Sequence, residues 1–143
     1  MVFKFTNSDI SSIENILGNV ASCIDNSWTW KLKSSETNQT LVFTIYNSAK
    51  ISSENEGVLI SIQTQFGYFE LHDCNAYLIF EPDEIIFINS QKDKLSSLVI
   101  GKSATCSLFS NIDRGILNTD FSELDPSVLL AAMQLSITET ILA

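Results

Sequence analysis

Short apolar runs separated by polar breaks dominate the middle of the chain, residues 68–90. Two breaks, His72–Asn75 and Glu81–Glu84, divide this stretch into three runs. The second and third runs, Ala76–Phe80 and Ile85–Ile88, are apolar at both alternating sets of positions. They are short for helices, and such runs are typical of strands buried on both faces. We therefore predict two adjacent central antiparallel strands, joined by a turn at Glu81–Glu84.

Further strands are predicted wherever apolar and polar side chains alternate with a period of two. Trp28, Trp30 and Leu32 alternate with polar residues, so both tryptophans are predicted to face the core rather than to stack on a ligand. Other strand candidates are residues 41–46, 58–63, 95–100 and 104–109. The short connections between these stretches favour antiparallel pairing of sequence neighbours.

Helical periodicity appears at the two ends of the chain. Apolar residues recur at three- and four-residue spacing from Ile10 to Ile24, which predicts a helix over residues 8–25. Residues 7–9 offer N-caps, and Ser11 with Glu14 fits a capping box. A second helix is predicted over residues 126–142, where Asp125 precedes Pro126 and an apolar stripe follows, formed by Leu129, Met133, Ile137 and Ile141.

These elements predict an α+β fold in a single domain, residues 1–143. The expected architecture is a curved antiparallel sheet of about six to eight strands. An N-terminal and a C-terminal helix are expected to pack against this sheet. No internal repeat or low-complexity tract interrupts the pattern.

Net charge restricts the kind of partner. The chain carries a formal charge of −9, with a pI near 4.3, so its surface repels nucleic acid and anionic lipid and attracts basic partners. No apolar run approaches the roughly 18 residues of a membrane-spanning helix. Residues 1–10 lack the pattern of a signal peptide. Neither nucleic acid nor a membrane is therefore expected as a partner.

The three cysteines indicate a reducing compartment. Cys23, Cys74 and Cys106 are an odd number, lie far apart in the sequence and have apolar or strand-like neighbours. Buried reduced thiols fit this pattern, which predicts a cytoplasmic protein.

The single histidine, His72, is the first place to look for catalysis. On one extended strand, Tyr68, Glu70, His72 and Cys74 would share a face, and a histidine beside a thiol can activate it. However, residues two apart on a strand lie roughly 7 Å apart, and Asp73–Asn75 resembles a turn. Phosphate-binding loops, nucleophile elbows and histidine pairs are missing from the sequence. We therefore predict a protein without catalytic residues or cofactor.

Acidic side chains cluster in two places, around Pro82 and before the predicted C-terminal helix. Calcium takes 6–8 oxygen ligands, but neither cluster has the spacing of a calcium-binding loop. The weak candidates for a divalent cation are Glu81, Asp83, Glu84, Asp120 and Glu123. The candidates for contact with a basic partner are Asp113, Asp120 and Glu123.

The predicted function is a small, acidic, non-catalytic module that binds a basic protein partner, such as an adaptor, an escort chaperone or an inhibitor of the immunity-protein kind. Two alternatives stay open. One is an acidic protein that responds to calcium, and the other is a carrier of a small apolar ligand in a pocket between the sheet and a helix.

Overall fold

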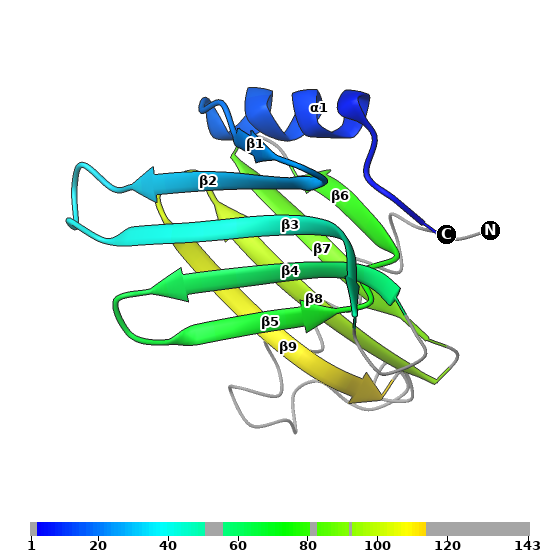
Figure 1. The fold of residues 1–143 in the computed structure, drawn as a ribbon. Coiled ribbons are helices and arrows are strands. Elements are labelled where there is room, and N and C mark those ends of the chain that lie inside the picture. The colour runs from blue at the N-terminus through cyan, green and yellow to red at the C-terminus, as the bar shows by residue number, and fades with distance from the viewer. Residues whose placement is uncertain (1–2, 51–55, 81–82, 92, 114–143) are drawn as a thin grey trace, which may run out of the picture.

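Two antiparallel sheets lie face to face in the computed structural model, which describes residues 3–50, 56–80, 83–91 and 93–113 (Figure 1). The first sheet has the order β1-β2-β3-β4-β5, with β1 at Ser22–Ile24, β2 at Ser27–Lys33, β3 at Thr40–Lys50, β4 at Glu56–Thr64 and β5 at Tyr68–His72. The second has the order β6-β7-β8-β9, with β6 at Ala76–Phe80, β7 at Glu84–Ser90, β8 at Lys94–Gly101 and β9 at Thr105–Asp113. Antiparallel pairing of sequence neighbours is confirmed, whereas the prediction of one curved sheet is wrong.

The chain passes from one sheet to the other between Cys74 and Asn75. The Cys74 amide donates to the Val58 carbonyl of β4 (3.0 Å), whereas the Asn75 amide donates to the Ile88 carbonyl of β7 (2.8 Å). Asp73, immediately before, has a left-handed backbone with φ 58. The polar break at His72–Asn75 is therefore a crossover between two sheets.

Aromatic side chains of both sheets and of the N-terminal segment pack together in the core between the sheets. Trp30 stacks on Phe43 with ring centroids 4.7 Å apart, and Phe87 of the second sheet lies 6.0 Å from both Phe43 and Phe5. Trp30 is fully buried and Trp28 partly buried against the same cluster, so the prediction that both tryptophans face the core is confirmed.

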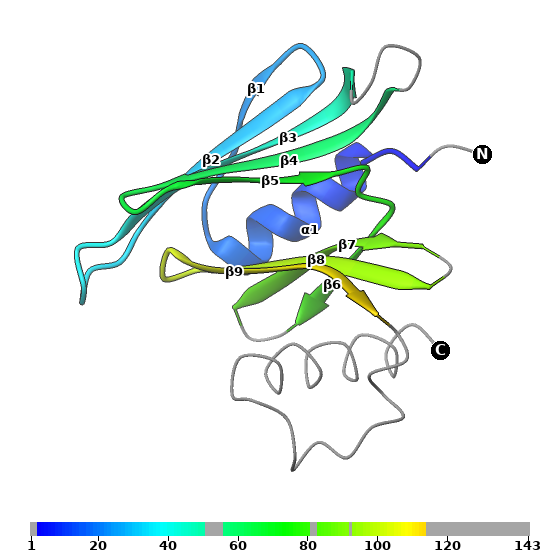
Figure 2. The same cartoon turned by 90° about the horizontal axis from the view of Figure 1, so that it is seen from below.

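The helix α1 (Asn7–Leu17) occupies one side of the space between the sheets (Figure 2). Its buried residues Ile10, Ile13 and Leu17 join the shared core. The predicted helix of residues 8–25 is too long at its C-terminal end. Gly18 adopts a left-handed backbone with φ 65, and its amide donates a hydrogen bond to the Glu14 carbonyl, which ends the helix. Consequently, Ile24 lies on β1 instead of the helical face and is 71% exposed.

The start of α1 also differs from the prediction. Thr6 is the N-cap, and its hydroxyl accepts a hydrogen bond from the Asp9 amide (3.2 Å). The Asp9 carboxylate accepts in return from the Thr6 amide (2.8 Å), which completes a capping box. The predicted box of Ser11 and Glu14 is not formed, because both residues lie inside the helix.

The two apolar runs of the sequence do form adjacent antiparallel strands, β6 and β7. All residues from Ile85 to Ile88 are buried, so β7 is covered on both faces as predicted. By contrast, β6 is an edge strand, and Ile79 is only partly buried. The prediction that both strands are central is therefore wrong for β6. The predicted helix 126–142 and its cap Asp125 lie outside the described residues.

Asp9 also connects the helix to the second sheet. The Tyr77 hydroxyl donates to Asp9 Oδ1 over 2.6 Å. Burial alone would raise the pKa of the Asp9 carboxyl, but the hydrogen bonds from Tyr77 and Thr6 outweigh it and lower this pKa below its ordinary value. Burial and the Asp9 charge raise the pKa of Tyr77.

Tyr77→Phe should lower the free energy of unfolding at neutral pH by about 1–2 kcal/mol, because hydrogen bonds to charged groups contribute about 1.5–3 kcal/mol and partial exposure of this bond reduces its contribution. Because the folded-state pKa of Asp9 is depressed, this contribution is present above the unfolded-state value of about 3.9 and is lost as the pH falls below it. Urea unfolding at neutral and acidic pH measures the difference. Tyr68→Phe is the control, since Tyr68 also donates to a carboxylate but is exposed; equal effects of the two variants at neutral pH would contradict the assignment.

Candidate functional site

The outer face of the first sheet, which points away from the second sheet, carries a polar row across four strands. Pairing aligns Thr29 of β2 with Thr44 of β3, Ser61 of β4 and Glu70 of β5. The Thr29 and Thr44 hydroxyls lie 2.9 Å apart and hydrogen-bond to each other. Glu70, at the end of the row, is the only charged member.

Three polar side chains of β5 meet on this outer face. Alternation along the strand places Tyr68, Glu70 and His72 on the same side. The Tyr68 hydroxyl donates to Glu70 Oε2 (3.2 Å), and His72 Nε2 lies 3.5 Å from Glu70 Oε1. Partial burial and the charge of Glu70 raise the pKa of Tyr68. Glu70 is thus an exposed carboxylate held between a phenol and an imidazole.

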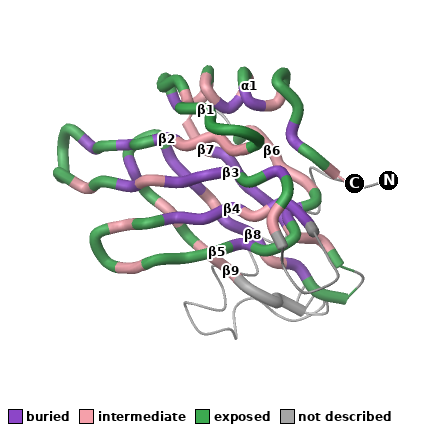
Figure 3. The backbone as a smooth tube through the Cα atoms, viewed as in Figure 1, coloured by how far each residue is buried: buried purple, intermediate pink, exposed green. Residues whose placement is uncertain are grey.

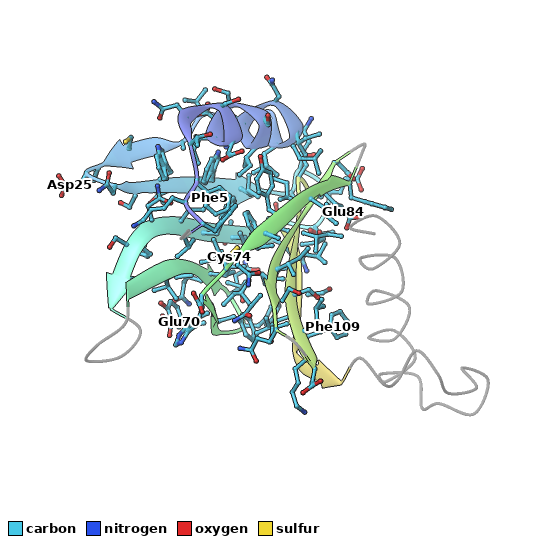
Figure 4. The ribbon with its side chains drawn as sticks, turned by 90° about the vertical axis from the view of Figure 1, so that its right-hand side faces the viewer. Phe5, Asp25, Glu70, Cys74, Glu84 and Phe109 are labelled. Atoms are coloured by element: carbon cyan, nitrogen blue, oxygen red, sulfur yellow. The ribbon has the colours of Figure 1, made fainter. Side chains whose placement is uncertain are left out.

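Cys74 does not join this group. It lies at the crossover, with its side chain in the core between the sheets, while Glu70 lies at their rim (Figure 4). Its thiol is buried, donates to the Ala76 carbonyl (3.3 Å) and has its pKa raised by burial to about 12. A thiol in this state is a poor nucleophile. His72 and Cys74 therefore do not form the nucleophile–base pair considered from the sequence.

The outward edge of β5 is free in the part of the chain that the structure describes. β5 pairs only with β4, and it is the last strand of its sheet (Figure 1). The Thr64 amide donates to the Gly67 carbonyl (2.8 Å) at the hairpin, and hydrogen-bonded pairs then alternate along the ladder. Phe69 and Leu71 therefore bond to β4, whereas the backbone groups of Tyr68 and Glu70 point away from it.

Next to this edge, a groove of about 290 Å³ opens between the two sheets. It lies between the β4–β5 hairpin and the β8–β9 hairpin, and its apolar lining comes from Phe66, Phe69, Ala104 and Cys106. Gln39, Thr40, Thr64, Gln65 and Thr105 supply neutral polar groups. Phe66 is 85% exposed at the hairpin tip. The groove thus offers an apolar surface without a charged side chain among its lining residues.

The residues proposed from the sequence for partner or metal binding lie elsewhere. Asp113 ends β9, and Asp120, Glu123 and Glu81 lie outside the described residues. Asp83 and Glu84 are partly buried at the start of β7, and the Asp83 carbonyl accepts from the Lys102 amide (2.9 Å). Within the described ranges, no three histidine, cysteine or acidic residues come together in a way that could hold a metal ion.

The pocket expected between the sheet and a helix is filled. Ile10, Ile13 and Leu17 of α1 are 0–5% exposed against the core, and the groove opens instead at the two hairpins. The thiols differ from the expectation as well: Cys74 is buried, Cys106 partly buried and Cys23 exposed, and all three are free. No helix in the described part is long and apolar enough to cross a membrane.

Comparison with known proteins gives no relative for this chain. No family model, curated protein or solved structure matches it.

Proposed function

We propose that the protein is a non-catalytic module that binds a basic protein partner. The observation that supports this proposal is the β5 region, where exposed aromatic side chains and the Glu70 carboxylate lie beside a strand edge that is free among the described residues. Phe66 is 85% and Tyr68 54% exposed, and Glu70 lies between Tyr68 and His72 on the outer face. Exposed aromatic groups are enriched at protein interfaces, and an acidic surface speeds encounter with a basic partner.

The charge of the whole chain supports the same proposal. With a formal charge of −9, the protein attracts cationic partners over roughly 10 Å at 0.1 M salt. Asp113, Asp120 and Glu123 remain proposed contact residues that strengthen this field. The three free thiols support a reducing compartment such as the cytoplasm as the place of the interaction.

A C-terminal helix over residues 126–142 that packs against a sheet belongs to the same proposal. Ile86, Ile88 and Leu95 of the second sheet form a separate buried cluster. An apolar helical stripe is a suitable cover for such a cluster.

The second candidate function is a carrier of a small neutral ligand, which the groove of about 290 Å³ supports. This volume is at the low end for ligand pockets, whose usual range is about 300–1,000 Å³. Protein binding is preferred because the groove is open and is lined in part by Phe69 of β5, the strand at the edge of its sheet. A small neutral ligand would also make no use of the acidic charge.

Association with the partner should slow clearly between low and moderate salt, because screening weakens the attraction between the acidic surface and a basic protein. The test is capture of partners from the native cytosol on the immobilised protein, followed by stopped-flow measurement of the association rate with the recovered protein. Charge reversal at Asp120 and Glu123 should slow association further. Charge reversal of the exposed Lys31 and Lys33 is the control and should leave the rate unchanged or raise it. A rate independent of salt would contradict the proposed function.

A further inference from the structure

We infer that the free edge of β5 is a docking site for an extended strand of the partner, which pairs antiparallel with Tyr68 and Glu70 and places an apolar side chain in the groove at Phe69. This inference rests on the proposed function and adds the site, the backbone conformation of the bound segment and its side-chain pattern. The bound segment has basic side chains on its outer face and apolar side chains on its inner face.

The backbone of β5 offers the hydrogen bonds that such a strand needs. The amide and carbonyl groups of Tyr68 and Glu70 point away from β4 and meet no partner among the described residues. At the end of the strand, Asn89 of the second sheet donates to the His72 carbonyl (2.9 Å), so the free segment ends there. Unpaired backbone groups on an edge strand are a template for another strand.

Two usual protections of an edge strand, proline and a β-bulge, are missing from β5. The strand has no proline, and its pairing with β4 runs without a register shift, whereas β3–β4 and β8–β9 each have one. Four of its five residues are exposed, as the green tube of β5 shows (Figure 3). The other edge of the sheet, β1, has only three residues, which is a protection in itself.

The groove lies beside Phe69, where it can receive an inward-pointing side chain of a strand added to β5. Side chains opposite Phe69 would point into the space between the sheets, and Phe69 itself lines the groove together with Ala104 and Cys106 of the β8–β9 hairpin. Figure 2 shows the edges of β5 and β9 on the same side of the molecule, with the sheets facing each other. In strand addition, backbone hydrogen bonds supply affinity, and pockets for alternate side chains supply specificity.

Glu70 determines which strand can bind. In an antiparallel pair, the residue opposite Glu70 lies on the same outer face, where lysine or arginine is favoured and an acidic side chain is disfavoured. A second copy of β5 centred on this position would place Glu70 against Glu70. The edge therefore disfavours self-pairing and selects a basic strand, in agreement with the net charge of −9.

Four short synthetic peptides, capped at both ends, test the inference by fluorescence anisotropy. The first alternates valine and lysine, and the second alternates valine and glutamate. The third and fourth repeat the first with N-methyl groups on the lysine or on the valine amides. In the antiparallel arrangement the lysine amides face β5 and the valine amides face away, because the residue opposite Glu70 exchanges both of its hydrogen bonds with it.

We expect the valine–lysine peptide to bind about tenfold more tightly than the valine–glutamate peptide, since attraction to Glu70 is replaced by repulsion. N-methylation of the lysine amides should weaken binding by at least about tenfold, because two or more edge hydrogen bonds are lost. N-methylation of the valine amides should have little effect. Equal effects of the two methylation patterns would overturn the inference, as would failure of the valine–lysine peptide to bind.

Glu70→Lys should reverse the preference between the first two peptides, whereas Asp93→Lys, which changes the net charge equally in the exposed β7–β8 turn, should preserve it. Tyr68→Pro removes an edge-facing amide and should weaken binding more than Tyr68→Ala does. A homodimer of the unmodified protein that Tyr68→Pro dissociates would overturn the inference, because a second copy would then fill the edge.

Cys106 reports directly on the groove. The bound valine–lysine peptide should slow alkylation of Cys106 by iodoacetamide several-fold, while Cys23 on β1 reacts at an unchanged rate. An unchanged rate at Cys106 under saturation would overturn the inference. The proposed function is tested separately. If Cys106 is not protected but a captured basic protein still associates in a salt-dependent way, only the docking site is wrong. If the association does not depend on salt, the proposed function is contradicted as well.

Discussion

Phe87→Ala is expected to lower the free energy of unfolding by about 3–5 kcal/mol, the usual cost of removing a large buried aromatic side chain. Phe87 is fully buried on β7, and its ring lies 6.0 Å from both Phe43 of the first sheet and Phe5 of the N-terminal segment. The substitution would leave a cavity where the two sheets and this segment meet. Denaturant unfolding followed by tryptophan fluorescence measures the loss, since Trp30 stacks on Phe43 next to the cavity.

Ile79→Ala is the control for this prediction and should cost only about 1 kcal/mol, because the side chain is partly exposed on the edge strand β6. The sequence does not distinguish the two positions, since both lie in uninterrupted apolar runs that are predicted to form central strands. The structure distinguishes the two positions, because Phe87 lies on the inner strand β7 and Ile79 on the edge strand β6. Equal losses of stability from the two substitutions would contradict an edge position for β6.

Local pattern was sufficient to predict most of the strands. The alternation of Trp28, Trp30 and Leu32 with polar residues marks β2 and correctly identifies its inner face. The pair β6–β7 was predicted as well, because two apolar runs are joined by a short acidic turn. In these cases the side chains that determine the pattern are the same ones that determine burial.

The end of α1 could not be predicted from periodicity. Val20 and Ile24 continue the three- and four-residue spacing of the helix, yet they are 78% and 71% exposed beyond its end. Gly18 lies inside the predicted span of residues 8–25, where a glycine only weakens a helix, whereas in the structure its left-handed backbone ends the helix. Both roles are common for glycine, and a single sequence does not distinguish them.

The division into two sheets and the free edge of β5 depend on strand order, which local pattern does not determine. Asp73–Asn75 was recognised as a turn, but the sequence does not say that the next strand starts a second sheet. The sequence therefore pointed to acidic loops as the binding site and missed β5. The available signal was the aromatic residues Phe66, Tyr68 and Phe69 next to Glu70, which the structure shows to be exposed.

Asn47→Leu is expected to lower the free energy of unfolding by about 2–4 kcal/mol, because it leaves two buried backbone groups without a hydrogen bond. Asn47 of β3 is 9% exposed and clamps the N-terminal segment to the first sheet. Its Oδ1 accepts from the Phe5 amide and its Nδ2 donates to the Phe5 carbonyl, both over 2.8 Å. Leucine has a similar volume, so urea unfolding of this variant reports mainly the loss of hydrogen bonds.

Asn75→Leu provides a closely matched comparison. Asn75 makes the same two-bond arrangement with Ser90, where Oδ1 accepts from the amide and Nδ2 donates to the carbonyl, each over 2.9 Å, but both bonds are exposed. After substitution, water can replace the lost partner at Ser90, whereas Phe5 is 3% exposed and its backbone groups stay unsatisfied. Asn75→Leu should therefore cost less than about 1 kcal/mol. Similar losses of free energy of unfolding for the two variants would show that burial does not determine how much the Asn47–Phe5 hydrogen bonds contribute to stability. The N-terminal segment would then be held mainly by the packing of the Phe5 ring against Phe87 and Tyr77.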